Sequence, residues 1–187
     1  MRIITGVYRG RKLEAPYGDD VRPTGDKVKE ALFSMLMYHV EDAFCVDLFA
    51  GTGNLGLEAL SRGARMCVFC DNSRDSIRYI KANIDHCGAS QQSRVVAGDF
   101  MKALEHLREP VDLFFLDPPY GTDLYTRAIE TIASLDLLAE NGIIVAEHDK
   151  NQVLPDEIGG FCRFKVRKYG KVVLSLYSYP GKEEDDQ

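Results

Sequence analysis

The sequence predicts an α/β fold, a doubly wound and mostly parallel sheet of seven strands within one domain. Short runs of β-branched and aromatic residues alternate with stretches of helical periodicity, and a glycine-rich turn follows the first of these runs. The last two runs, residues 161–169 and 171–179, flank a single glycine, which predicts an antiparallel C-terminal hairpin. The chain of 187 residues is 45% hydrophobic, enough for one sizeable core and too short for two large ones.

We expect three segments along the chain. Residues 1–22 are a basic arm that forms a short β-hairpin and belongs to the same domain, residues 23–181 form the α/β unit, and the acidic residues 182–187 form a disordered tail. The remaining strands are expected at 44–49, 66–71, 94–98, 111–116 and 142–148, with helices before and between them. The last helix is expected to span 124–138, with Asn141 and Gly142 as its stop.

The first strand leads into a turn that is typical of nucleotide-binding sites. Gly51, Gly53 and Gly56 stand in the pattern G-x-G-x-x-G, in which glycines permit positive φ angles and a close approach of a ligand to the backbone. The following helix presents free N–H groups to such a ligand. Asp71 ends the second strand about twenty residues after the first glycine, where a carboxylate commonly binds ribose hydroxyls. The pattern alone fits NAD, FAD and S-adenosylmethionine sites, and also turns without a ligand.

A second motif, Asp117, Pro118, Pro119 and Tyr120, follows the fourth expected strand of the sheet. Two prolines fix φ, remove two N–H donors and end the strand, so the tetrapeptide is a stiff tip with a carboxylate, an aromatic ring and free carbonyl groups. A plain turn at the end of a strand is an alternative interpretation of the tetrapeptide in isolation. Because the carboxyl ends of parallel strands meet at one edge of a sheet, we expect this tip to lie beside the glycine-rich turn.

Together the two motifs resemble a known family. Asp47-Leu-Phe-Ala-Gly-Thr-Gly53 followed by Asp-Pro-Pro-Tyr is similar to class I, Rossmann-like methyltransferases that use S-adenosylmethionine and act on amino groups of nucleobases. With Arg2-Ile-Ile-Thr-Gly-Val-Tyr-Arg-Gly-Arg-Lys-Leu13 and Arg22-Pro-Thr24, the chain resembles the bacterial 16S ribosomal RNA guanine-N2 methyltransferases of the RsmD family. The resemblance implies S-adenosyl-L-methionine as cofactor and N2-methylation of a guanine as the reaction. It also implies 16S rRNA as partner, within the small subunit or an assembly intermediate.

The resemblance and the spacing together assign three groups of residues. In the catalytic group, Asp117 and the carbonyl of Pro118 accept the hydrogens of the amine, Tyr120 stacks on the base, and Pro119 completes the motif. The cofactor group comprises Asp47, Phe49, Gly51, Thr52, Gly53, Gly56, Asp71, Asn72, Asp99 and Phe100. The RNA-binding group comprises Arg2, Tyr8, Arg9, Arg11, Lys12 and Arg22. Asp99 has a second interpretation as the cap of the following helix, and the two are compatible.

Charge supports RNA binding only through its distribution along the chain. The net charge of −6 opposes binding to phosphates. The first 29 residues, however, contain seven basic and four acidic residues, so this part carries +3 and the remainder −9. A second basic stretch, residues 161–171, alternates basic and apolar residues as a half-exposed strand does, and we interpret it as a solvated strand face.

The remaining reactive residues indicate structure rather than chemistry. The five cysteines, an odd number without framework spacing, do not form a disulfide pattern, and we expect no metal site. Cys67 and Cys70 lie three apart in a strand and therefore point to opposite faces, which favours core thiols over a metal or redox pair. Glu147 and His148 suggest an acid/base pair, but a polar end of a strand is the commoner explanation.

Three other functions stay open at this point. A DNA adenine-N6 methyltransferase has the same mechanism, but we expect a chain this short to lack a separate domain that reads a DNA sequence. An NAD-dependent oxidoreductase fits the glycines but has no use for the second motif. An RNA-binding module without catalysis fits less well, because the acid and the tyrosine are intact. No segment is apolar enough to span a bilayer or to act as a secretory signal, so we expect a cytoplasmic protein without membrane contact. We infer no obligate protein partner from the sequence.

Overall fold

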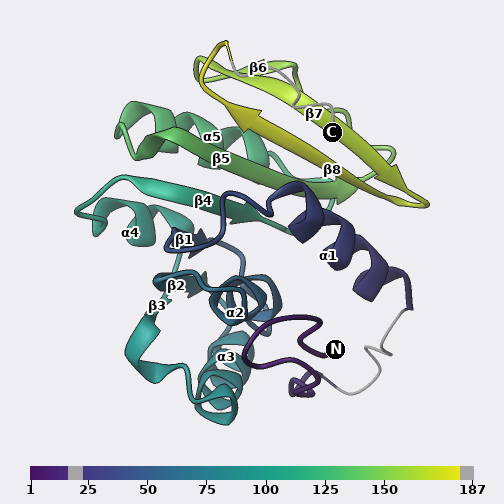
Figure 1. Cartoon of the computed structure of the whole chain (residues 1–187). Helices are drawn as coiled ribbons and strands as arrows, with labels where there is room; N and C mark the ends of the chain where they lie inside the picture. The colour runs from purple at the N-terminus through teal and green to yellow at the C-terminus, as the bar shows by residue number, and fades with distance from the viewer. Residues whose placement is uncertain (17–22, 182–187) are drawn as a thin grey trace.

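The computed structural model describes residues 1–16 and 23–181. Two predictions, the RNA-binding role of Arg22 and the disorder of residues 182–187, concern residues outside these ranges. The described residues form one mixed sheet with helices on both faces (Figure 1), and this architecture confirms the doubly wound α/β prediction. No helix within these ranges combines the length and the apolar character needed to cross a bilayer.

The sheet has the strand order β3-β2-β1-β4-β5-β8-β7-β6. Its strands are β1 (Phe44–Asp47), β2 (Met66–Asp71), β3 (Ser93–Ala97), β4 (Val111–Leu116), β5 (Leu138–Asp149), β6 (Glu157–Ile158), β7 (Phe161–Tyr169) and β8 (Val172–Ser178). The helices are α1 (Pro23–Met35), α2 (Asn54–Ser61), α3 (Arg74–Cys87), α4 (Phe100–Glu105) and α5 (Leu124–Ser134), with one 3-10 turn at Ser90–Gln92. The first five strands in this order are parallel, and the other three are antiparallel to their neighbours. The direction of winding reverses between β1 and β4, which is where sheets of this class bind ligands.

The described part of the sheet has eight strands where the sequence predicts seven. The additional strand, β6, consists of two residues that pair with Phe161 and Cys162 at the edge of the sheet. Two residues give no periodicity, so a sequence pattern does not reveal such a strand. The arm forms less β-structure than predicted. In place of a hairpin of two strands, its two sides meet in one isolated antiparallel bridge between Arg2 and Lys12.

The boundary between α5 and β5 differs from the prediction. The helix ends at Ser134 rather than at residue 138, and β5 already begins at Leu138, so Asn141 and Gly142 lie inside the strand and do not stop the helix. Leu138 pairs with Val111 of β4 and is buried in the core beneath α4 and α5. Strand pairing and burial of this leucine therefore override the helical periodicity of the segment.

Each face of the sheet has its own hydrophobic core. One core is formed with α1, α2, α3 and the amino-terminal arm, and the other with α4 and α5 (Figure 1). Cys67 lies in the first core and Cys70 in the second, and both are buried free thiols, as the spacing predicts. Successive residues of a strand thus face different cores, and this alternation decides which side chains reach the site.

The amino-terminal arm is fixed to the domain by hydrogen bonds to α2. The buried carboxylate of Glu58 accepts the backbone N–H groups of Ile4 (2.8 Å) and Thr5 (3.0 Å). Gly6 has a φ of 88°, and a Cβ there would lie 1.7 Å from the carbonyl oxygen of Ser61, so only glycine permits this approach. The arm is therefore packed on α2 rather than extended into solvent.

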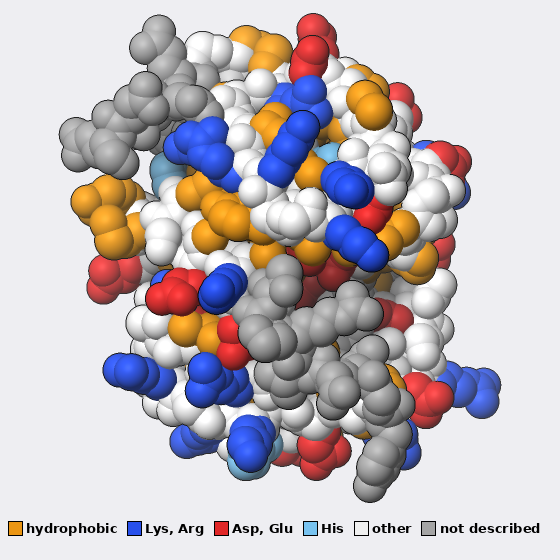
Figure 2. Space-filling view, turned by 90° about the vertical axis from the view of Figure 1, so that its right-hand side faces the viewer, with side chains coloured by type: hydrophobic (Ala, Val, Ile, Leu, Met, Phe, Trp, Pro, Cys, Tyr) orange, Lys and Arg blue, Asp and Glu red, His pale blue; other side chains and the backbone are white. Residues whose placement is uncertain are grey.

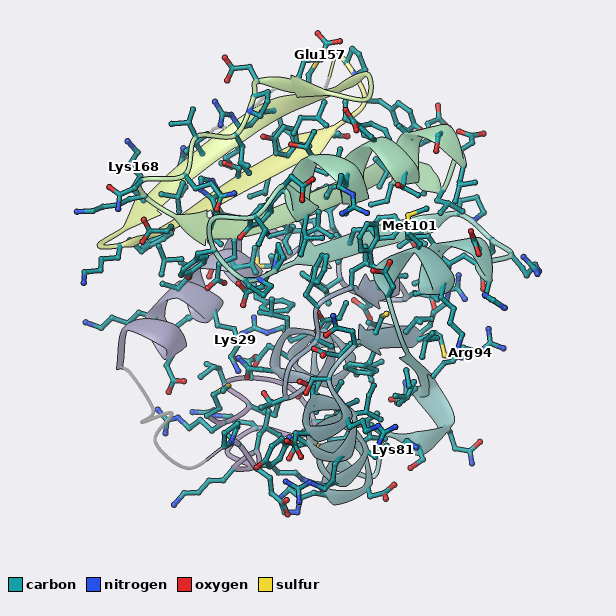
Figure 3. The ribbon with its side chains drawn as sticks, turned by 180° about the vertical axis from the view of Figure 1, so that it is seen from behind. Lys29, Lys81, Arg94, Met101, Glu157 and Lys168 are labelled. Carbon is teal, nitrogen blue, oxygen red and sulfur yellow. The ribbon has the colours of Figure 1, made fainter. Side chains whose placement is uncertain are left out.

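Lys29 does not contribute to the basic surface that the charge count predicts. Its ammonium group lies between α1 and α2, 3.0 Å from the Glu58 carboxylate, and donates to Asn54 Oδ1 (2.7 Å) and the Arg2 carbonyl (2.6 Å) (Figure 3). Burial lowers the pKa of Lys29, although the negative charge of Glu58 opposes this shift. Because its partner is distant in the sequence, counting charges along the chain does not identify such an internal pair.

Candidate active site

A cavity of about 1130 Å³ opens at the carboxyl ends of the parallel strands, where the strand order reverses. Figure 2 looks onto this edge, and acidic side chains are visible in the hollow near its centre. The sequence-predicted residues that line the cavity are Asp47, Phe49, Gly51, Thr52, Asp71, Asn72, Asp99, Phe100, Asp117, Pro118, Pro119 and Tyr120. The predicted residues Gly53 and Gly56 are not among the lining residues. Segments that are distant in the sequence thus meet around one hollow.

Two carboxylates hold the glycine-rich turn in place. Gly51 and Gly53 have φ angles of 56° and 81°, and Gly53 is the N-cap of α2. The N–H of Gly51 donates to Asp71 Oδ2 (2.9 Å), and the N–H of Gly56 in the first turn of α2 donates to buried Asp47 Oδ2 (3.1 Å). The N-terminus of this helix, a common binding site for phosphate, therefore already contains a carboxylate of the protein itself.

We expect Gly56→Ala to destabilise the protein and to weaken cofactor binding. A Cβ at this position would lie 2.3 Å from Phe69 Cε1 and 2.7 Å from Cys67 Sγ, so α2 must move away from β2. Overpacking of this kind costs about 1–3 kcal/mol of unfolding free energy, which denaturant titration measures. Gly25→Ala is the control, because a Cβ there meets nothing within 4 Å among the residues that the structure describes. Equal stability of the two variants would show that the close packing has no energetic consequence.

The ends of β2 and β3 contribute two further predicted cofactor residues. Asp71 is half-buried, and in addition to its bond with the turn its Oδ1 accepts the N–H of Ser73 (2.8 Å). Asp99 Oδ1 accepts the N–H of Met101 (2.9 Å) and so caps α4, the second interpretation of this residue. Both carboxylates line the cavity and have lone pairs left for a ligand. Their roles toward ribose and adenine stay predictions.

The tip formed by residues 117–120 is held by neighbouring segments. The hydroxyl of Tyr125 in α5 lies 3.4 Å from the carbonyl oxygen of Pro118 and donates to the carbonyl of Glu147 (2.6 Å). Gln152, which follows β5, binds two backbone groups of the loop after the tip. Tyr120 is 52% exposed and lines the cavity, so a planar ligand can reach its ring.

Three carboxyl groups in the cavity have raised pKa values. Burial raises the pKa of Asp47 to about 7, although the N–H of Gly56 lowers it. Burial also raises the pKa of Glu147 to about 6. Poor hydration raises the pKa of Asp117 well above its usual range, and the negative charges of Glu147 and Asp47 raise it further. Asp117 lines the cavity and is exposed as a residue, whereas the surrounding protein leaves its carboxyl group poorly hydrated.

The charges of the cavity favour a cationic ligand over a dinucleotide. In addition to the three carboxyl groups above, four acidic residues line it: Asp26, Asp71, Asp75 and Asp99. The basic side chain in its described lining, Lys29, is paired with Glu58. A pyrophosphate would be repelled here, whereas the positive sulfur of S-adenosylmethionine would be attracted. The open glycine backbone and the polar strand ends fit the nucleoside part of the same cofactor.

The residues that line the cavity differ from those predicted from the sequence in two ways. The residues of the RNA-binding group that the structure describes, Arg2, Tyr8, Arg9, Arg11 and Lys12, do not line it. Several lining residues were not identified from the sequence, among them Glu147, which we interpreted as a polar strand end. One available signal was its position at the end of a parallel strand, the same rule that selects Asp117.

Comparisons with known proteins identify the family of the chain. A sequence model of the family described as Conserved hypothetical protein 95 matches residues 1–178. The chain is 34% identical to "Ribosomal RNA small subunit methyltransferase D" of Escherichia coli over 186 residues, covering 100% of this chain and 93% of that one. It is 36% identical over 159 residues to the protein of the same name from Haemophilus influenzae, covering 82% and 81% of the two chains. The solved structure of "Putative methyltransferase yhhF from Escherichia coli" matches with a TM-score of 0.85 at 34% identity, covering 97% of this chain and 99% of that one. The chain therefore belongs to the family described as Conserved hypothetical protein 95, the RsmD family of S-adenosylmethionine-dependent methyltransferases.

Proposed function

We propose that this protein methylates the N2 amino group of a guanine in the 16S rRNA of the small ribosomal subunit. The observation that carries the proposal is that the tip 117–120 and the glycine-rich turn line one acidic cavity. Relatives named for the methylation of small-subunit rRNA support the choice of substrate. The accessible ring of Tyr120 supports a planar base as the methyl acceptor.

The reaction requires an amine nitrogen to become a nucleophile. S-adenosylmethionine supplies an electrophilic methyl group on a positively charged sulfur. The lone pair of the guanine amine is conjugated into the ring and must be freed before the nitrogen attacks. Acceptors aimed at the amine hydrogens free this lone pair and stabilise the positive charge that develops on nitrogen.

Asp117 and Pro118 provide these acceptors in the proposed mechanism. The carboxylate of Asp117 and the carbonyl of Pro118 bind the two amine hydrogens, and Tyr120 stacks on the base, which contributes about 1–3 kcal/mol. The proton that nitrogen loses after transfer passes to Asp117 or to water beside it, and the raised pKa of Asp117 suits this uptake. Holding the reacting groups in line supplies up to roughly 7–11 kcal/mol of the barrier. The target base must leave its stack to reach the cavity.

The arm contacts RNA at a distance from the target base in this proposal. Arg11 donates to the carbonyl of His86 (2.6 Å) in the last turn of α3, whereas Ser76 near the start of α3 lines the cavity. His86 follows Ser76 by ten residues along α3, which at 1.5 Å per residue separates these positions by roughly 15 Å. The guanidinium of Arg11 also lies over the ring of Tyr8, 5.4 Å from its centroid. Arg9, Arg11 and Lys12 are therefore proposed to bind phosphates rather than the methylated nucleotide.

A second basic region lies at the carboxyl end of β5. Val172 of β8 pairs with Asp149 of β5, so the turn between β7 and β8 is at the same sheet edge as the cavity. Lys150, Lys168 and Lys171 are exposed around this turn, and Lys168 projects from its end in Figure 3. Figure 2 shows basic side chains both above and below the hollow. From the sequence we interpreted residues 161–171 as a solvated strand face. The position of their basic side chains beside the cavity edge instead supports contacts with RNA phosphates.

We expect neutralisation of either basic region to raise KM for RNA without lowering kcat at saturating RNA. Two double variants, Arg9→Gln/Lys12→Gln and Lys168→Gln/Lys171→Gln, each remove two positive charges. For single-stranded RNA, each is expected to reduce the steepness of the plot of log affinity against log salt concentration by about 1.4. Filter binding at several salt concentrations and steady-state kinetics measure both quantities. A pair of substitutions that changes neither affinity nor slope lies outside the RNA interface.

The proposed function is tested with rRNA from a strain that lacks the gene. The purified protein is incubated with S-adenosylmethionine and with naked 16S rRNA, small subunits or duplex DNA, and the nucleosides are identified by mass spectrometry. N2-methylguanosine in the rRNA is expected, and N6-methyladenosine instead would overturn the proposal. Titration with S-adenosylhomocysteine and with NADH tests the oxidoreductase alternative, which a preference for NADH would favour.

A further inference from the structure

Glu147 and Asp117 are neighbours across two parallel strands. The last registered pair of β4 and β5 is Leu116 with Ala146, so the next residues, Asp117 and Glu147, stand side by side. Neighbouring strands lie about 4.8 Å apart, and both residues line the cavity. The negative charge of Glu147 also acts on the carboxyl group of Asp117. The two carboxyl groups therefore belong to one site.

The carboxyl group of Glu147 has no compensating cation in the part of the chain that the structure describes. None of the ion pairs there includes it. The hydroxyl of Tyr125 donates to the backbone carbonyl of Glu147 and not to its carboxylate. Glu147 is half-buried, and removing water from an acid without a cation beside it is unfavourable, as the raised pKa of Glu147 reflects. A proton donor on a ligand would offset this cost.

Guanine offers such a donor next to the amine that is methylated. Its N1–H and its N2 amino group are adjacent donors on one edge, whereas adenine has an acceptor at N1 beside its amino group. Enzymes that act on an unstacked base read this edge by hydrogen bonds. Two adjacent carboxylates complement two adjacent donors.

We propose that Glu147 accepts the N1–H of the target guanine while Asp117 accepts a hydrogen of its N2 amine. Glu147 is then a specificity-determining residue for the reaction, and this assignment rests on the proposed guanine-N2 function. It explains how the site selects guanine, because the N1 lone pair of adenine would face a carboxylate and be repelled. A site built to bind an N–H group rejects an analogue that lacks it by as much as 10⁴–10⁵-fold.

The test compares guanine with 2-aminopurine, which carries the same 2-amino group but has an acceptor without hydrogen at N1. After mass spectrometry has located the methylated nucleotide, RNA with either base at that position is ligated into full-length 16S rRNA, and kcat/KM is measured. The wild-type protein is expected to prefer guanine by at least about 10²-fold. In Glu147→Gln the side-chain amide can donate to N1 of 2-aminopurine, so this preference is expected to fall by about tenfold or more.

The matched control is Glu140→Gln, the same substitution at an exposed position of the same strand outside the cavity. It is expected to keep the wild-type preference, and S-adenosylhomocysteine affinity and the unfolding midpoint verify that both variants are folded. An unchanged preference in Glu147→Gln would overturn the assignment of Glu147 alone. A wild-type protein that does not methylate guanine-containing rRNA would overturn the proposed function and this inference with it, so the two failures are distinguishable.

Discussion

Asp117→Ala is expected to lower kcat for methyl transfer by a factor on the order of 10²–10³ or more, with nearly unchanged affinity for the cofactor. The substitution removes one of the two acceptors for the amine hydrogens and also the group that takes up the proton. The proposed cofactor contacts at Gly51, Asp71 and Asp99 lie at the ends of other strands and are not altered. Single-turnover kinetics at saturating rRNA and calorimetric titration with S-adenosylhomocysteine separate chemistry from binding.

Two further variants sharpen this experiment. Asp117→Asn keeps an acceptor oxygen but cannot take up a proton, so its rate is expected to lie between those of the wild type and Asp117→Ala. Asp123→Ala removes an exposed carboxylate at the start of α5 and is expected to leave kcat unchanged. Full activity of Asp117→Ala would reject the catalytic assignment. A parallel loss of S-adenosylhomocysteine binding would instead assign Asp117 to the cofactor.

Glu58→Ala is expected to reduce the free energy of unfolding by roughly 3–5 kcal/mol. Its fully buried carboxylate lies 3.0 Å from the Lys29 ammonium and 2.9 Å from Arg62 Nε, and it also accepts two backbone N–H groups of the arm. Removing it leaves the buried ammonium of Lys29 without its counter-charge. Denaturant titration measures the loss.

The exposed pair of Arg65 and Glu109, separated by 2.7 Å, supplies the control for Glu58. Glu109→Ala is expected to cost at most about 1 kcal/mol, because solvent screens this pair. Glu58→Ala should also weaken cofactor binding, since the arm contributes Met1 and Pro16 to the lining of the cavity. If Glu58→Ala and Glu109→Ala reduce the free energy of unfolding by similar amounts, the buried carboxylate of Glu58 stabilises the fold no more than an exposed one does.

The sequence predicts the parts of the fold that depend on local patterns. Strand-like runs that alternate with helical stretches predict that the strands are mostly parallel. The spacing of Cys67 and Cys70 predicts that the two thiols lie on opposite faces of β2. The capping of α4 by Asp99 follows from the preference of aspartate for this position. These features need only residues close in the chain, or the rule that strand ends meet at one edge of the sheet.

Features that depend on contacts between distant residues were not predicted. The pairing of Lys29 with Glu58 removes a charge that we counted in the basic first 29 residues. The bond between Arg11 and α3 places the turn of the arm away from the cavity, which charge alone does not show. Glu147 was interpreted as a polar strand end because its neighbour in the sheet, Asp117, lies thirty residues earlier. In each case the partner that gives the residue its role is remote in the sequence.

The most direct test of the account is a structure of the protein with bound S-adenosylhomocysteine. The account predicts that the ribose hydroxyls contact Asp71, that the adenine lies beside Asp99 and Phe100, and that the sulfur faces Asp117 with Tyr120 open to a base. A cofactor bound outside the cavity, or one whose sulfur points away from Asp117, would contradict it.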